Sequence, residues 1–279
     1  MARPAGPSLG RVADDPAMRA LTELRSGDPV RITSALQRIH SLAPQQVPQV
    51  IELLDRDEVA QAAYLALKKA GDRIAGQLVD ALGNPASTYN VRKRIPKVLA
   101  WCRSRAAWDG LTAHLLDERF EVRTRCAKAM EKILARHPEY RPEPNTIFVL
   151  VQRELTTTRK VSGSGTQRGV DMALKDRASK SIEHIFTLLG LVLPRRHLRL
   201  AFRALRAEDG KLSGVALEYL DSILPRSLRE ELTAHFEGSP SPADGVLTKE
   251  EVAKLVDSNP SMMHRLEYWI DPANSSKKE

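Results

Sequence analysis

Along the first half of the chain, apolar residues recur in blocks whose internal spacing is that of helices. Four valines each open such a block, directly after an acidic or Asn-rich turn: Val30, Val59, Val91 and Val122. They lie 29, 32 and 31 residues apart, and three of them are followed by arginine. Further apolar residues follow at intervals of three or four, which is typical of one buried helix face. The pattern predicts a helix that starts close to each valine.

A second apolar block precedes each valine, so each repeat is predicted to be a helix, a short turn and a helix. The preceding blocks are residues 21–24, 50–54, 78–82 and 111–116, and the apolar pairs that follow are Ala63 and Leu67, Ile95 and Leu99, and Cys126 and Met130. The first repeat fits with a one-residue slip, at Ala35 and Ile39. One helix pair cannot bury its apolar face alone, so neighbouring pairs must stack. We predict an all-α fold, an α–α superhelix of stacked antiparallel helix pairs, with four repeats over residues 17–137.

Beyond residue 137 the pattern becomes less regular. Three prolines between His137 and Pro144 stop the array, because proline cannot continue a helix. We predict irregular helical repeats over residues 145–237, with helices at 147–155, 170–193, 195–206, 213–224 and 227–236 and a Gly/Ser loop at 162–169. Residues 1–16 are predicted to be a flexible terminus, 238–247 a linker, 248–271 terminal capping helices that open on a capping box, and 272–279 a frayed tail.

Two segments carry the consensus of a known repeat. Residues 28–31 read Asp-Pro-Val-Arg, and residues 118–123 end in Glu-Val-Arg after an acidic turn. This pattern resembles the start of the second helix in HEAT repeats, a family related to armadillo repeats. The resemblance implies that the Asp and Arg side chains tie successive turns together. Ala60 stands where arginine is expected, so that ladder is expected to be incomplete.

The C-terminal half carries a second resemblance, in residues 182–191, 201–206 and 216–221. It is similar to the cytosolic HEAT domain of some bacterial transporter-like proteins of the nucleotide-translocase type. The resemblance implies a bacterial regulatory or docking module, and transport itself does not carry over because the chain has no membrane segment.

Composition agrees with a helical core in a reducing compartment. Hydrophobic residues make up 42% of the chain and aromatic residues 5%, which favours helices packed through Leu and Ala over a β-sandwich. The longest apolar run, residues 188–193, is far shorter than the roughly 20 residues of a membrane span. The first residues lack the apolar core of a signal peptide, and two cysteines cannot form a disulfide framework. We expect a cytoplasmic protein.

Metal and cofactor chemistry has little support. The seven histidines are not spaced as metal ligands, and Cys102 and Cys126 lack a Cys-x-x-Cys spacing, so we predict no metal site. The 162–169 loop lacks the Gly-Lys-Ser/Thr ending of a phosphate-binding loop, so we predict no cofactor and interpret this loop as a connector.

Trp101, Trp108 and Asp109 allow one enzymatic alternative. Some HEAT-like DNA glycosylases hold a damaged base with Trp and Asp, since a carboxylate beside an aromatic wall stabilises the positive charge on a departing base. Asp109 also falls where we expect a helix to begin, and there an acidic residue favours the helix dipole. We prefer the capping interpretation and keep a DNA glycosylase as the alternative.

Basic stripes give the clearest functional signal in a chain of net charge +8. At helical spacing they could line a binding groove. The candidate residues for binding an anionic partner are Arg92, Lys93, Lys97, Lys128, Lys132, Arg136, Arg195, Arg199, Arg203 and Arg206. A plain solvated face, interleaved with Glu121, Glu131 and Glu208, explains the same pattern. We predict a non-enzymatic scaffold or adaptor that binds a protein partner on its concave surface, and the alternative is a duplex nucleic-acid binder. The sequence does not define an oligomeric state.

Overall fold

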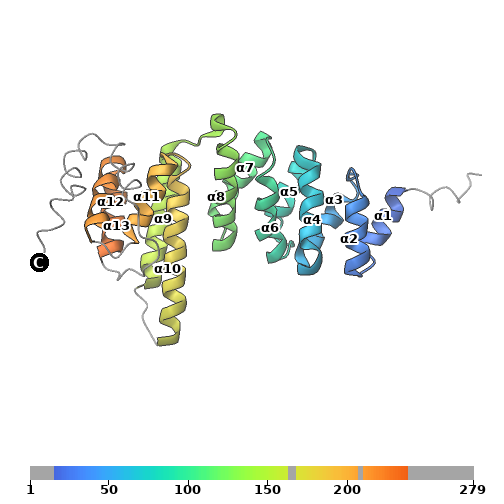
Figure 1. Ribbon diagram of the computed structural model, residues 1–279, viewed down its shortest axis with the longest axis horizontal. Coiled ribbons are helices and arrows are strands. Elements are labelled where there is room, and N and C mark those ends of the chain that lie inside the picture. Colours follow the sequence, from blue (N-terminus) through green and yellow to red (C-terminus); the bar gives the residue numbers. More distant parts are fainter. Residues whose placement is uncertain (1–15, 163–167, 207–209, 238–279) are drawn as a thin grey trace, which may run out of the picture. The chain divides into compact units, whose positions relative to one another are not determined.

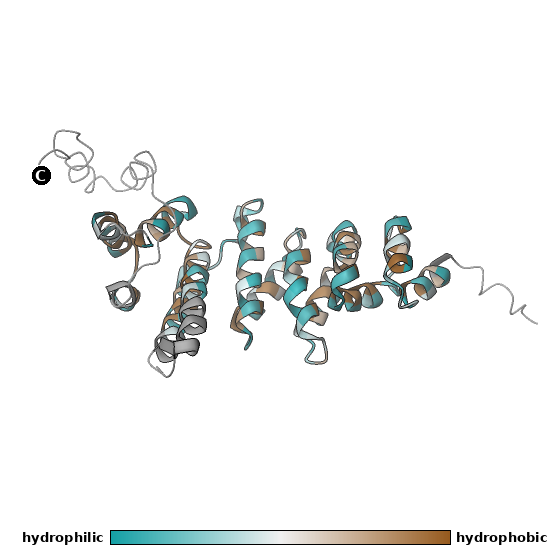
Figure 2. Cartoon of the chain, turned by 60° about the horizontal axis from the view of Figure 1, so that its bottom comes forward, coloured by the Kyte–Doolittle hydropathy of each residue, from teal (hydrophilic) through white to brown (hydrophobic). Residues whose placement is uncertain are grey.

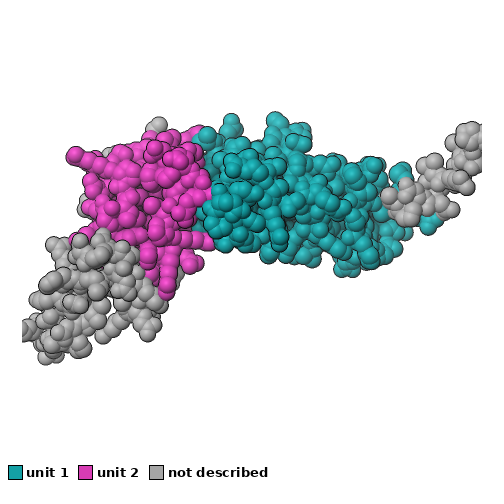
Figure 3. Space-filling model, turned by 90° about the horizontal axis from the view of Figure 1, so that it is seen from above, with its two compact units in different colours: residues 1–140 teal, residues 141–279 magenta. Residues whose placement is uncertain are grey.

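The structure, a computed structural model, describes residues 16–162, 168–206 and 210–237. These residues form helices, turns and loops with no β-strand among them, which confirms the all-α class (Figure 1). The chain divides into two compact units, Met1–Tyr140 and Arg141–Glu279 (Figure 3). The predicted flexible terminus apart from Pro16, most of the 162–169 loop, the linker, the capping helices and the tail lie outside the described residues.

Unit 1 has two layers of helices. It contains α1 (Pro16–Leu24), α2 (Pro29–Arg38), α3 (Val47–Glu52), α4 (Asp57–Ala70), α5 (Ala75–Gly83), α6 (Tyr89–Leu99), α7 (Arg105–Ala113) and α8 (Phe120–Leu134). In one layer α2 contacts α4, α4 contacts α6 and α6 contacts α8; in the other α1 contacts α3, α3 contacts α5 and α5 contacts α7. Short 3-10 turns follow α3, α4 and α7, and another covers Pro138–Tyr140. Each predicted second helix thus lies beside the second helix of the next repeat (Figure 1).

Two of the second helices, α2 and α6, begin at capping side chains. The Asp28 carboxylate accepts the Val30 amide at 2.9 Å, and the Thr88 hydroxyl accepts the Val91 amide at 3.3 Å. Such caps satisfy backbone donors that have no partner inside the helix.

The repeating valine is buried at three of its four predicted places. Val59, Val91 and Val122 are buried, whereas Val30 opens α2 as predicted but is 73% exposed. In α2 the first buried residue is Ile32, four residues after the N-cap Asp28. In α4, α6 and α8 the first buried residue is the valine, three residues after the N-cap. Leu36, rather than Ile39, continues the buried face of α2.

The short-helix layer depends on a close approach between α5 and α7. A Cβ built on Gly110 of α7 would stand 2.3 Å from Cγ2 and 2.7 Å from Cγ1 of Val79 in α5. Only glycine fits at this crossing, because real Cβ atoms do not approach other carbons so closely.

Unit 2 consists of longer helices. They are α9 (Pro144–Ser162), α10 (Arg168–Leu189), α11 (Arg195–Leu205), α12 (Gly210–Ile223) and α13 (Arg226–Glu237). Consecutive helices pack on one another, and α13 returns to contact α9. The prediction placed the first of these helices at 147–155, but it extends further at both ends, and α10 ends four residues earlier than predicted, in a turn before Pro194. None of the helices in the described part of the chain is long and apolar enough to cross a membrane.

Candidate binding surface

On the outward side of α4, α6 and α8, exposed residues recur at equivalent positions after each repeating valine. Six positions after each buried valine stand Leu65, Lys97 and Lys128, and ten positions after it stand Lys69, Trp101 and Lys132. The side chains at both positions are exposed, whereas Val59, Val91 and Val122 are buried. We call this outward side, which also carries Lys68, Lys93 and Arg136, the cationic face. It is largely hydrophilic along α6 and α8 (Figure 2).

Trp101 is the centre of a group that joins three helices of this face. Its indole Nε1–H donates to the Tyr64 hydroxyl of α4 at 2.8 Å. Lys68 Nζ lies 3.5 Å from the centroid of the Trp101 ring, and Lys97 Nζ lies 4.2 Å from that of Tyr64. From the end of α8, the Arg136 guanidinium lies 5.6 Å from the Trp101 ring. We call Tyr64, Lys68, Lys97, Trp101 and Arg136 the Trp101 cluster.

Arg136 is held in place by the backbone. Its Nη2 donates to the Ala100 carbonyl at the end of α6, and its Nε donates to the Lys132 carbonyl at 3.1 Å. Carbonyls at a helix C-terminus have no partner within the helix, so a cation there is favoured by both hydrogen bonding and the helix dipole. The guanidinium therefore stays beside Trp101 rather than extending into solvent.

A second aromatic group lies at the opposite end of α6. Lys93 Nζ lies 4.9 Å from the centroid of the Tyr89 ring, and the Arg119 guanidinium lies 5.1 Å from it. Together with Lys97 and Trp101, Tyr89 and Lys93 continue at four-residue intervals along one side of α6. A ring thus stands at each end of this row, with two lysines between them.

Arg92 belongs to the interior and not to the cationic face, so the structure places this predicted binding residue elsewhere. Its Nε donates to the Leu82 carbonyl at 2.9 Å and its Nη2 pairs with Asp117, which precedes α8. The Arg92 side chain is 16% exposed and that of Asp117 only 4%. This pair joins α6 to the turn before α8, in the next helix pair.

Other repeats use different residues for the same connection. Arg94 donates to the Leu54 carbonyl and pairs with Asp57, and this guanidinium holds the pKa of the Asp57 carboxyl below its usual value. Asp55 accepts the Thr88 hydroxyl at 2.6 Å. The links between repeats therefore do not follow one consensus position.

The arginine stripe of α11 lies in unit 2. Arg195 and Arg199 are exposed, whereas Arg203 and Arg206 are half-buried. The Arg206 guanidinium lies 5.5 Å from the Phe202 ring centroid. The first two arginines of this stripe are therefore more exposed than the last two.

Trp108 and Asp109 do not form an aromatic wall beside a carboxylate. Trp108 is 3% exposed and stacks on Tyr140 with ring centroids 5.7 Å apart. Asp109 lies in the middle of α7, where it pairs with Arg105 at 2.8 Å, and Ser104 is the N-cap. The prediction that Asp109 caps the helix start was wrong, because α7 begins four residues earlier.

Both cysteines are free thiols in the core. Burial raises the pKa of Cys102 to about 12 and raises the pKa of Cys126 strongly. Neither thiol is a nucleophile at neutral pH, since only the thiolate reacts. The part of the chain that the structure describes contains no group of three or more His, Cys, Asp or Glu residues able to hold a metal ion.

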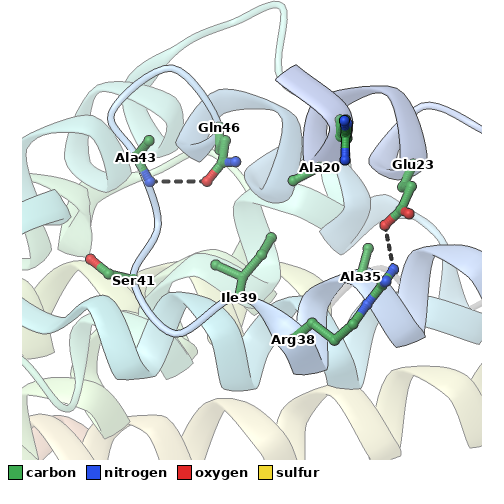
Figure 4. Close-up of a pocket in the computed structure, with 9 residues that line it drawn as sticks. Ala20, Glu23, Ala35, Arg38, Ile39, Ser41, Ala43 and Gln46 are labelled. Atoms are coloured by element: carbon green, nitrogen blue, oxygen red, sulfur yellow. Dashed lines mark hydrogen bonds and ion pairs between the residues drawn. The ribbon is translucent and has the colours of Figure 1, made fainter. Parts of the chain in front are cut away.

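A pocket of about 510 Å³ lies between α1 and α2 and the loop after α2 (Figure 4). Glu23 pairs with Arg38 across it, and the buried Gln46 side chain accepts the Ala43 amide at 3.0 Å. These polar groups bind one another, so we assign the pocket no ligand.

The sequence did not predict that Tyr64 and Lys68 belong to the site. The stripes were traced on single helices, and these two residues meet Trp101 from a neighbouring repeat, 37 and 33 residues away. Aligning the repeats on the buried valine, and comparing the positions six and ten residues later, would have pointed to this face.

The chain was also compared with known proteins. No known protein family matches it, and no curated protein shows significant sequence similarity to it.

Proposed function

We propose that the protein is a non-enzymatic scaffold of HEAT-like helical repeats that binds a protein partner. Its stacked pairs would form an α–α superhelix in which α2, α4, α6 and α8 line the concave side, and the partner would lie along the cationic face. This places the protein among cytoplasmic docking modules, in line with the second resemblance of its C-terminal half.

The observation that carries the proposal is the continuity of the cationic face across three repeats. Lys97 and Lys128 occupy equivalent exposed positions on α6 and α8, and Lys132 and Trp101 do the same one turn later. Structural needs are met by other residues, since Arg92 and Arg94 make the links between repeats. Exposed Leu65 and half-exposed Trp101 add apolar surface, and mixed apolar and charged surface is typical of protein interfaces.

Duplex nucleic acid is the second candidate partner, and the same row of cations favours it. Lys93, Lys97, Lys128 and Lys132 follow two neighbouring helices, and lysines in such rows can contact successive phosphates. This binding releases counterions, so its affinity falls steeply as salt rises.

Site-specific photo-crosslinking tests the proposed surface. Leu65, 53% exposed on the cationic face, and Leu116, 50% exposed in the turn after α7, are each replaced by p-benzoylphenylalanine. In native cell extract we expect a protein adduct at Leu65 and none at Leu116. Equal adducts at both positions, or none at Leu65, would contradict a partner on this face.

A salt titration separates the two candidates. Binding of a 20-base-pair duplex is followed by fluorescence anisotropy from low to physiological salt. The protein-scaffold proposal expects weak binding that is lost at physiological salt. Retained submicromolar affinity there would favour the nucleic-acid candidate.

A further inference from the structure

We propose that the Trp101 cluster is a carboxylate-binding site that recognises an acidic, Asp/Glu-rich segment of the partner. This inference rests on the proposed function and names the chemistry of the partner.

The cluster brings cations from three helices together around two aromatic rings. Lys68 comes from α4 and Lys97 from α6, and Arg136 follows α8. Like charges repel one another at such short range, but the electron-rich faces of Trp101 and Tyr64 offset part of this repulsion. A bound anion would neutralise the remaining repulsion between the cations. The charge arrangement of the unliganded cluster therefore favours anion binding.

Two acidic groups of these repeats have partners outside the cluster. Asp72, in the turn after α4, accepts the backbone amides of Arg103 and Ser104 at 2.7 and 2.8 Å. Glu121, at the other end of α8, lies 3.5 Å from Arg125. The contacts that hold Lys68 and Lys97 are with rings and not with carboxylates.

The rings hold the cations ready for a ligand. A free lysine loses about 1.5–2 kcal/mol of rotamer freedom when it is fixed. Packing against Trp101 and Tyr64 restricts Lys68 and Lys97 before any ligand binds, and the backbone carbonyl of Ala100 does the same for Arg136. A ligand carboxylate therefore meets donors that are already ordered, which strengthens binding.

A peptide carboxylate suits this site better than a single-stranded nucleic acid does. Binding of single strands relies on bases stacked on open aromatic rings. Lys68 covers the Trp101 ring at 3.5 Å and Arg136 lies beside it, so this ring offers no open face of that kind. Leu65 stands exposed next to Tyr64, and an apolar side chain fits a peptide better than it fits a phosphate backbone.

The test uses the full chain and two synthetic peptides. One contains six Asp residues alternating with Gly, and the other has Asn at the same places. Isothermal titration at low salt measures each affinity. We expect the Asp peptide to bind at least tenfold more tightly than the Asn peptide, and a 20-base-pair duplex to be unaffected by changes in the cluster.

Matched variants place the binding within the cationic face. Lys68→Gln should weaken the Asp peptide about tenfold, because one direct charged contact is lost. Arg105→Gln makes the same charge change at an exposed residue of α7, outside the cationic face, and should weaken binding less than about twofold. Trp101→Leu should resemble Lys68→Gln, and Trp101→Phe should restore most of the affinity because it returns a ring face to Lys68.

Three results would overturn the proposal. Equal affinity for the Asp and Asn peptides would show that carboxylates are not recognised. Equal losses in Lys68→Gln and Arg105→Gln would show a diffuse charge effect. Tighter binding of the duplex, with a loss in Lys68→Gln, would assign the cluster to nucleic acid. In each case an adduct at Leu65 would still support a partner on this face, so the two proposals fail separately.

Discussion

Replacing Arg92 with alanine should destabilise the fold without acting directly on the binding surface. Arg92 donates to the Leu82 carbonyl and pairs with Asp117, whose side chain is only 4% exposed. Breaking a fully buried ion pair costs about 3–5 kcal/mol, because one charge is left buried without a partner. Asp117 still accepts the Arg119 amide at 3.0 Å and Arg92 is partly exposed, so we expect the low end of that range. The predicted loss in the free energy of unfolding is about 3 kcal/mol.

Urea denaturation, followed by circular dichroism and tryptophan emission, measures this loss. Asp117→Ala should give a similar loss, and the double variant should lose much less than the sum, because the two residues are coupled. The control is Lys93→Ala on the adjacent residue, which should change the unfolding free energy by less than about 0.5 kcal/mol. If Arg92→Ala is as stable as Lys93→Ala and instead weakens binding of the anionic peptide, the assignment of Arg92 to the interior is wrong.

Three further predictions concern packing, thiol chemistry and catalysis. Gly110→Ala should lower the free energy of unfolding by about 1–3 kcal/mol, as its Cβ would overlap Val79, and Val79→Ala in the same chain should recover part of that loss in urea titrations. Because burial raises the pKa of Cys102 to about 12 and that of Cys126 strongly, both thiols stay protonated at pH 8. They should react with Ellman's reagent only after unfolding, and rapid labelling of the folded protein would contradict their burial. Asp109→Asn should leave any nucleic-acid binding unchanged, and release of a damaged base by the parent protein but not by this variant would restore the glycosylase alternative.

The pattern of the sequence predicted the helices of unit 1 well, because each depends on its own spacing and caps. The valine period located α4, α6 and α8, whose apolar positions all follow the helix start by the same interval. The period also located α2, which begins at Pro29, but Val30 is exposed because α2 starts one residue earlier relative to the buried Ile32. A one-residue difference rotates a helix by about 100°, which is enough to move a side chain from the core to solvent.

Charge on a helix face was also readable from the sequence, but the role of each charge was not. Arg92 and Lys93 are neighbours in one basic stretch, yet Arg92 is fixed to the next repeat and Lys93 lies over the Tyr89 ring on the cationic face. The difference depends on Asp117, which reaches Arg92 only when α8 is packed on α6. The sequence predicted the basic stripes, but it did not show which of their cations bind a partner and which link the repeats.

The amino-acid sequence by itself determined the all-α class, the helix pairs of the first four repeats and the basic sides of their helices, because these follow from local spacing along the chain. Only the tertiary structure decided which residues meet across repeats. Trp101, Tyr64 and Lys68 come together because α4 and α6 pack side by side, and Trp108 is buried because Tyr140 stacks on it. Such contacts join residues more than 30 positions apart, and a pattern within one helix carries no information about them.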